Sequence, residues 1–197
     1  MIYFDALTQA DCEQIRKWRN EDISAARTPF LLTDIMQKDF YEKVISNRDS
    51  EHRYWAIRDL GDNYDTKCGF CGGLIDNITK RCDYNLCGIA GLTNIEWENG
   101  RAEIALMIAP HLRKNHYGKD AIGILKKWGF GRMRLHTIYA CVYGNNHYLV
   151  QWWKGLNADE VTSYPGGKFY DHAYHPTHHF TWVNQPDTMF TVSTENK

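Results

Sequence analysis

Residues 103–121 read EIALMIAPHLRKNHYGKDA, and this stretch decides how the rest of the chain is interpreted. The apolar run before Pro110 predicts a strand that ends there, because proline cannot donate a ladder hydrogen bond. A basic loop, 111–119, then leads into a helix. The N–H groups in the first turn of a helix lack partners within the helix and carry the positive end of its dipole. With Gly118 allowing close approach to the backbone, the pattern predicts a phosphate-binding loop or, alternatively, a basic loop that only caps a helix.

The segments on either side of this stretch are rich in strands. Residues 87–97 and 101–109 predict two antiparallel strands joined by a turn at 98–100, where Asn-Gly tolerates positive φ. After the loop, apolar residues recur at helical spacing as far as Met133, and 137–143 predicts another strand.

The N-terminal part predicts a strand followed by two helices. Residues 2–4 form a short apolar run, and Thr8 with Asp11 has capping-box spacing at the start of a helix that runs to about Asn20. Thr33 is a suitable N-cap for the second helix. The second helix has its apolar residues at helical spacing: Ile35, Met36, Phe40, Val44 and Ile45.

The remaining elements complete one sheet. Residues 53–58 predict a strand, 149–153 a short helix, and 161–183 two strands around Pro165-Gly166-Gly167. The order of elements predicts a mixed α/β (α+β) domain with a largely antiparallel sheet flanked by helices.

Composition limits the classes of protein. The chain has 197 residues, of which 43% are hydrophobic and 24% charged, which predicts one domain, 1–185, with a frayed tail at 186–197. A formal charge of −1 gives no general electrostatic reason to bind nucleic acid. The sequence shows neither a membrane-spanning stretch nor the pattern of a signal peptide, so we expect a cytoplasmic protein with no membrane partner.

Residues 59–86 are an unusual, cysteine-rich connection. Cys68, Cys71, Cys82 and Cys87 have spacings that a structural zinc site accepts, but buried cysteines are also common as small core residues. We therefore treat zinc as possible and not favoured. Four histidines, His172, His175, His178 and His179, follow in the tail, where strand alternation would scatter them over both faces of a sheet.

Three short motifs carry a resemblance to a known family. Residues 113–118, Arg-Lys-Asn-His-Tyr-Gly, follow a strand and a proline, Asn146 follows the next strand, and Trp18-Arg19-Asn20 ends the first helix. Residues 87–157 in particular resemble the GNAT superfamily of acetyl-CoA-dependent N-acetyltransferases, closest to the branch of ribosomal-protein alanine and amino-sugar acetyltransferases. The family loop is Arg/Gln-x-x-Gly-x-Gly/Ala, so His116 replaces its first glycine. The resemblance does not extend to 59–86, which is longer than the usual hairpin of the family.

The resemblance implies a set of residues that bind acetyl-CoA. A backbone N–H of Met107 or Ile108 would polarise the thioester oxygen, as in an oxyanion hole. The other implied cofactor-binding residues are Arg113, Lys114, Asn115, His116, Tyr117, Gly118, Lys119, Asn146 and Trp153. The family often has a tyrosine where this chain has Trp153, so Trp153 is either a wall for the cofactor or a plain core residue.

The resemblance also implies a general base, because an amine is mostly protonated at neutral pH and cannot attack a carbonyl. Glu103 matches a glutamate often found in relatives, and a salt bridge with Arg101 is its alternative role. Glu96 and Glu98, on the partner strand, are the other candidates.

The general acid is less well defined, because the indole N–H of Trp153 is too weak an acid to protonate the departing thiolate. Three interpretations follow: no acid is needed, Tyr148 supplies the proton, or efficient chemistry has been lost.

The expected activity is direct transfer of an acetyl group from acetyl-CoA to a primary amine, with an amino sugar as the expected kind of acceptor. The alternatives are a protein N-terminal or lysine acetyltransferase, and a non-catalytic CoA-binding interaction module. We expect a monomer or homodimer.

Overall fold

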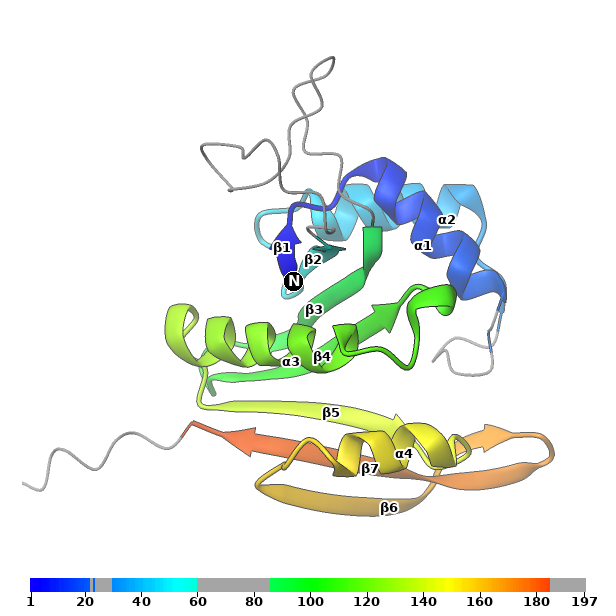
Figure 1. Ribbon diagram of the computed structural model, residues 1–197, viewed down its shortest axis with the longest axis vertical. Helices are drawn as coiled ribbons and strands as arrows, with labels where there is room; N and C mark the ends of the chain where they lie inside the picture. The colour runs from blue at the N-terminus through cyan, green and yellow to red at the C-terminus, as the bar shows by residue number, and fades with distance from the viewer. Residues whose placement is uncertain (22, 24–29, 60–85, 185–197) are drawn as a thin grey trace, which may run out of the picture.

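The computed structural model describes residues 1–21, 23, 30–59 and 86–184. Its seven strands form one sheet in the order β1-β2-β3-β4-β5-β7-β6, as Figure 1 shows. All neighbouring strands are antiparallel except β4 and β5, which are parallel. The strands are β1 (Ile2–Asp5), β2 (Arg53–Asp59), β3 (Leu86–Glu96), β4 (Arg101–Ile108), β5 (Thr137–Tyr143), β6 (Glu160–Tyr170) and β7 (Ala173–Val183). The prediction of a mixed, largely antiparallel sheet flanked by helices is confirmed.

Four helices flank the sheet: α1 (Gln9–Glu21), α2 (Asp34–Phe40), α3 (Tyr117–Lys127) and α4 (His147–Lys154). Alternation along the strands divides their side chains between two apolar layers, because neighbouring residues of a strand face opposite sides of the sheet. On β2, Ala56 packs in the layer with α1, whereas Ile57 packs in the layer with α3 and α4. The sheet therefore separates the first two helices from the last two.

The layer beneath α3 and α4 is the larger core. It buries residues from β3, β4, β5 and β7 together with α3 and α4, and its largest fully buried side chains are Trp182 and Phe180. The layer beneath α1 is smaller and is formed by Leu7, Cys12, Ile15, Trp18, Ala56, Ile89 and Ala109.

The first helix begins as its sequence predicts. The Thr8 N–H donates to the Asp11 carboxylate at 2.9 Å, and the Asp11 N–H donates to Thr8 Oγ1 at 3.1 Å. This reciprocal pair confirms the capping box with Asp in place of Glu. The same carboxylate accepts a hydrogen bond from Arg58 Nη2 of β2, which ties the start of α1 to the sheet.

The second helix also begins at its predicted cap, since Thr33 Oγ1 accepts from the Met36 N–H. Its apolar spacing was only partly a guide to packing. Phe40 and Ile45 pack against the α1 layer, but Ile35 and Met36 are exposed.

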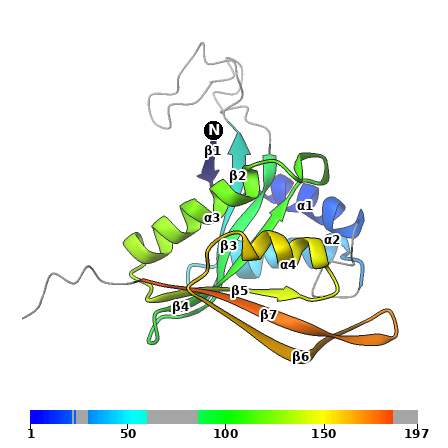
Figure 2. The same cartoon turned by 60° about the horizontal axis from the view of Figure 1, so that its bottom comes forward.

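The C-terminal hairpin differs from its prediction. β6 continues through Pro165-Gly166-Gly167, where the register with β7 shifts, and the chain turns later at Asp171 and His172. Both turn residues have positive φ, 46° and 61°, which suits a tight hairpin turn. The proline and glycines form a bulge in the strand, so the hairpin is longer than predicted and extends past the end of β5 (Figure 2).

Candidate functional site

The parallel pair β4–β5 stays together for only part of its length. Within these two fully described strands, register pairs run from Arg101↔Thr137 to Glu103↔Tyr139 and stop there. β4 then continues to Ile108 beside β3, whereas β5 continues beside β7. Figure 1 shows the two strands diverging after their common start.

This divergence leaves backbone groups of β4 facing an edge with which none of the seven described strands pairs. The Ala109 N–H donates to the Cys87 carbonyl of β3 at 2.8 Å. Because successive residues of a strand direct their N–H and C=O groups to opposite edges, the Ile108 and Leu106 N–H groups point away from β3, toward the side of β5. Of the two predicted oxyanion donors, Ile108 thus has the suitable direction, and the Met107 N–H belongs to the β3 side.

The basic loop brings the start of α3 to the same end of β4. A 3-10 turn, Pro110–Leu112, follows the strand, and Lys114 has a positive φ of 68°. α3 begins at Tyr117, and its N-cap residue, His116, makes no side-chain cap hydrogen bond. The N–H groups of the first turn therefore depend on partners outside the helix. The exposed residues of this loop and first turn are His111, Arg113, Lys114, Asn115, His116, Lys119 and Asp120.

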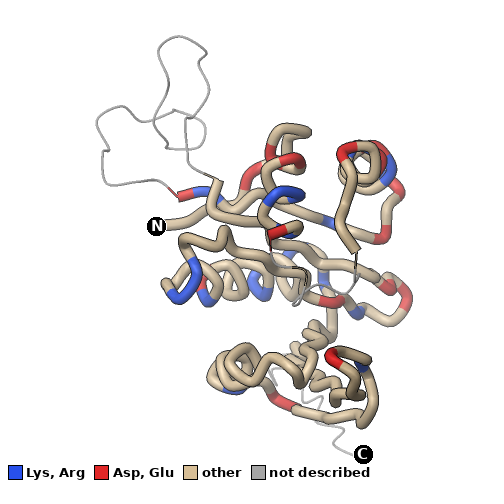
Figure 3. Tube along the Cα trace, turned by 90° about the vertical axis from the view of Figure 1, so that its right-hand side faces the viewer, with Lys and Arg blue, Asp and Glu red and all other residues tan. Residues whose placement is uncertain are grey.

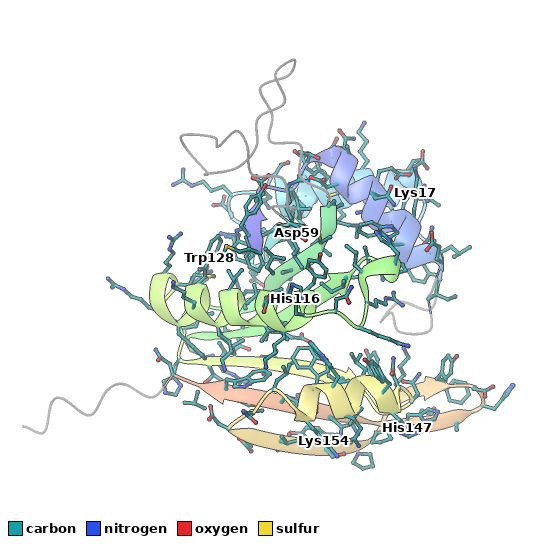
Figure 4. All side chains as sticks on the ribbon, viewed as in Figure 1. Lys17, Asp59, His116, Trp128, His147 and Lys154 are labelled. Carbon is teal, nitrogen blue, oxygen red and sulfur yellow. The ribbon has the colours of Figure 1, made fainter. Side chains whose placement is uncertain are left out.

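Two contacts of Tyr117 hold the end of the loop in place. The ring of His116 stacks on Tyr117 at 4.8 Å between centroids, which shows how a side chain is accommodated where the family has glycine. The Tyr117 hydroxyl donates to Asp59 Oδ2 at 2.6 Å, which ties the first residue of α3 to the end of β2. Figure 4 shows Asp59 near the start of β3 and His116 beside the first turn of α3.

A cavity of about 500 Å³ adjoins this anchor, between α1, the ends of β2 and β3, and the loop. Asp59 lines this cavity with its carboxylate, which also accepts a hydrogen bond from the Met1 ammonium at 3.2 Å. Trp18 and His111 line the opposite side, with their rings 6.3 Å apart.

Gly118 is needed for the close approach of α3 to its neighbours. A Cβ built there would lie 3.1 Å from the ring of Trp152 and 3.8 Å from Leu106 Cδ2. The first turn of α3, the diverging part of β4 and the helix α4 therefore meet at this glycine. The sequence analysis named Trp153 and not Trp152, whose ring is the one beside Gly118.

The two tryptophans of α4 have different surroundings. Trp153 is 5% exposed and packs against Phe180 and Trp182 in the core. Trp152 is half-buried and faces Gly118. Of the two interpretations of Trp153, its position in the structure is that of a core residue. The tryptophan that lies beside the loop is Trp152. Asn146 caps α4, because its Oδ1 accepts from the Leu149 N–H at 2.9 Å.

Glu103 lies where β4 and β5 separate. Its side chain is 4% exposed and shares the sheet face of Met107, on the side of α1 and α2. Asn94 Nδ2 donates to Glu103 Oε2 at 3.0 Å. The alternative bases lie farther from the divergence: Glu96 pairs in register with Arg101 and accepts from Asn99 Nδ2, and Glu98 is exposed in the turn.

The charges are distributed unevenly over the molecule. In Figure 3 they gather on the upper part, with the helices and first strands, and are sparse on the lower part formed by α4, β6 and β7. The cations of the loop and α3 thus lie on the part of the molecule that contains the diverging end of β4.

The cysteine prediction is only partly testable. Cys68, Cys71 and Cys82 lie outside the described residues. Cys87 is 1% exposed in the core, and burial raises the pKa of its thiol to about 11. Among the residues that the structure describes, no group of three or more His, Cys, Asp or Glu is placed to hold a metal ion.

The comparisons with known proteins match this geometry. Residues 2–151 match the model of the acetyltransferase (GNAT) domain family. The chain belongs to the GNAT acetyltransferases. Among curated proteins, none matches its sequence. None of the helices described here is long and apolar enough to cross a membrane.

Solved structures with the same fold include two based on spermidine N-acetyltransferase from Vibrio cholerae. A chimera of that enzyme, SpeG, with hSSAT has a TM-score of 0.72 and 19% identity, and the match covers 92% of this chain and 95% of the other. The Vibrio cholerae enzyme in complex with CoA and spermine has a TM-score of 0.71 and 18% identity, over 92% and 95%. The comparisons support the GNAT superfamily and not the specific branch predicted from sequence.

GNAT enzymes use acetyl-CoA, and the described residues fit it. Among the described strands none pairs with the edge that the Ile108 N–H faces, and a Cβ at Gly118, in the first turn of α3, would crowd the Trp152 ring. A free backbone donor of this kind suits a carbonyl oxygen, and the start of a helix suits a pyrophosphate.

Proposed function

We propose that this acetyltransferase moves the acetyl group of acetyl-CoA to the primary amine of a small molecule, by direct transfer in a ternary complex. One observation carries the proposal: the β4–β5 pairing ends at Glu103↔Tyr139, so the Ile108 N–H faces an edge that no strand of the described residues pairs with. A backbone donor held at such a place can bind an oxyanion without reorganising.

The binding side of the proposal uses the loop and α4. Arg113, Lys114 and Lys119 contribute charge, and the first-turn N–H groups of α3 bind phosphate oxygens. Trp152 supplies the apolar wall in place of Trp153. When bound, acetyl-CoA supplies the thioester carbonyl that an amine can attack, and every other contribution comes from this chain.

The proton-accepting side uses Glu103. Its side chain is on the face of α1 and α2, whereas α3 lies on the other face. Acceptor and cofactor therefore approach from opposite faces and meet where the strands separate. Glu103 and Ile108 are five residues apart on β4, roughly 16 Å in an extended strand, so Glu103 accepts the proton of the acceptor ammonium through water.

A separate general acid is not required by this arrangement. The Trp153 ring is buried in the core, and Tyr148 is 61% exposed on α4. A thiol has a pKa near 8.5, so a thiolate is a tolerable leaving group at neutral pH.

Two kinds of small amine are the first acceptors to test. Amino sugars follow from the motifs of the sequence, and polyamines follow from the spermidine and spermine named for the similar structures. A protein N-terminus or lysine is the third kind.

The test combines binding with turnover. Calorimetry should show micromolar acetyl-CoA binding to the purified protein, and free thiol should appear only when an accepted amine is added. Turnover with peptides alone would shift the acceptor to proteins. Tight CoA binding with no turnover on any amine would support the non-catalytic module and contradict the proposal.

A further inference from the structure

Asn94 has an unusual backbone at a place where two strands change register. The pairing of β3 with β4 shifts between Thr93 and Glu96, and Asn94 within this bulge has a φ of +49°. Asparagine accepts this left-handed conformation more readily than most residues. A bulge redirects the side chain it contains, and here it brings an exposed residue of β3 to a buried residue of β4.

The contacts of Asn94 join three strands. Its side-chain Nδ2 donates to Glu103 Oε2 at 3.0 Å. Its backbone N–H donates to His52 Nδ1 at 3.0 Å, just before β2. The adjacent Thr93 hydroxyl donates to the backbone carbonyl of Glu103 at 3.2 Å. The bulge is thus anchored at one end to His52 and holds both the backbone and the carboxylate of Glu103 at the other.

We infer that Asn94 is a positioning residue for the proton-accepting carboxylate of Glu103. The inference rests on the proposed function, because it gives Asn94 a role only if Glu103 is the base. An amide donor on one carboxylate oxygen fixes the rotation of the carboxylate and favours its ionised form. Both effects keep a buried glutamate ready to accept a proton, although burial alone would favour the neutral acid.

The other charged and titratable groups around Glu103 come from each neighbouring strand. On β4 itself Arg101 shares its face, two residues away, and Arg101 lies 5.5 Å over the ring of Tyr139. Tyr139 of β5 is the register partner of Glu103 and stacks on His179 of β7. On the side of β3, His52 reaches the site through the Asn94 N–H. Asn94 is thus a neutral side-chain donor to Glu103 in a charged and aromatic setting.

The experiment measures the pH profile of kcat/KM for Asn94→Asp and Asn94→Gly. Both replacements accept a positive φ, so the bulge is retained while the amide donor is lost. Asp also adds a negative charge beside Glu103, which raises the pKa of that carboxylate. The acid limb of the profile should move up by about one pH unit in Asn94→Asp and by less in Asn94→Gly. Activity at high pH and acetyl-CoA affinity should stay within about twofold of the parent, since neither protonation nor the loop is affected there.

Asn99 provides the matched control, because its Nδ2 also donates to a glutamate, Glu96 Oε2, at 2.9 Å in the adjacent turn. Asn99→Asp should leave the acid limb unchanged. A uniform loss at every pH in the Asn94 variants would mean a structural role and overturn the inference. An unmoved limb, or an equal shift in Asn99→Asp, would overturn it as well.

Glu103→Gln separates this failure from failure of the proposed function. If Glu103→Gln keeps full activity, Glu103 is not the general base, and Asn94 has no positioning role. If Glu103→Gln loses activity while the acid limb of Asn94→Asp stays in place, the base stands and only the inference fails.

Discussion

The two halves of β4 have the same partner on one side and different surroundings on the other. From Arg101 to Glu103 the strand lies between β3 and β5, and its backbone is paired on both edges. From Ile104 to Ile108 the β3 ladder continues without interruption, but the described register with β5 has ended. The first half is paired on both edges, and the second half directs the Leu106 and Ile108 N–H groups to the edge on the side of β5.

The backbone donor of the proposed site depends on the strand topology and not on the type of residue that carries it. Leu106 and Ile108 are ordinary apolar strand residues, and their side chains pack against the α3 layer. Their N–H groups have no register partner on β5, because the β4–β5 pairing ends at Glu103↔Tyr139. Glu103 marks the boundary between the two halves, so its substitution tests the chemistry of both.

Glu103→Gln should give the largest functional effect. Loss of a general base lowers kcat by about 10²–10⁴-fold, and the amide cannot take the proton. The affinity for acetyl-CoA, measured by calorimetry, should not change, because Glu103 lies on the opposite face from α3. Full activity in Glu103→Gln would restrict the function of β4 to its second half.

The neighbouring tryptophans should separate stability from binding. Trp153→Ala removes a buried ring and should lower the free energy of unfolding by about 3–5 kcal/mol. Trp152→Ala should cost less stability but weaken acetyl-CoA binding about tenfold, or about 1.4 kcal/mol. Denaturant unfolding and calorimetry on both variants measure this. If Trp153→Ala kept its stability but bound acetyl-CoA weakly, Trp153 and not Trp152 would be the residue that contacts the cofactor.

Two glycines of α3 offer the next test. Gly118→Val forces a side chain against Trp152 and should cost about 1–3 kcal/mol of stability and most of the acetyl-CoA affinity. Gly123→Val is the control, because a Cβ there meets nothing within 4 Å. Equal behaviour of the two variants would mean that the contact of α3 with α4 is not needed beside the second half of β4.

The paired edge of β4 should give the smallest effect, seen at high pH. The Cys87 carbonyl accepts the hydrogen bond of the Ala109 N–H at this edge. Burial raises the pKa of the Cys87 thiol to about 11. A thiol pKa raised in the folded state stabilises the protein below the unfolded pKa of about 9, and this contribution is lost as pH rises toward 11. Burial also raises the pKa of the Cys12 thiol to about 11, so Cys87 is measured by the difference between the two proteins. Between pH 8.5 and 10.5 the free energy of unfolding should fall by about 1–2 kcal/mol more in the parent than in Cys87→Ala. The half-exposed Cys141 is the control. The free energy of unfolding of Cys141→Ala should fall with pH as that of the parent does.

Local signals in the sequence predicted much of this architecture. Thr8 with Asp11, Thr33, the turn at 98–100 and Pro110 mark boundaries through hydrogen bonds or φ angles that their own residues supply, and the structure has elements beginning or ending at each of them. The hairpin turn at Asp171-His172 was missed because Pro165-Gly166-Gly167 has stronger turn residues, although long-range pairing with β7 turns them into a bulge. Local propensity cannot report such pairing.

The site was predictable only where it is local. The loop 111–119 and its helix could be read from residue types, because charges and a glycine next to a helix start have a direct physical meaning. The sequence does not show whether the Met107 or the Ile108 N–H points away from β3, because this depends on how β3 and β4 pair. It also does not show which tryptophan of α4 lies beside Gly118, because this depends on the orientation of the helix against the sheet. Asn94 gave no signal, since its link to Glu103 spans nine residues and depends on a bulge.

The most direct measurement is amide hydrogen exchange by NMR along β4, without and with acetyl-CoA. We expect the Met107 and Ala109 amides to be protected in both states by the β3 ladder. The Leu106 and Ile108 amides should exchange quickly in the free protein, and Ile108 should become protected when acetyl-CoA is added. Unchanged exchange at Ile108 in the saturated protein, or new protection confined to the paired half Arg101–Glu103, would contradict the assignment of the site to the diverging half of β4.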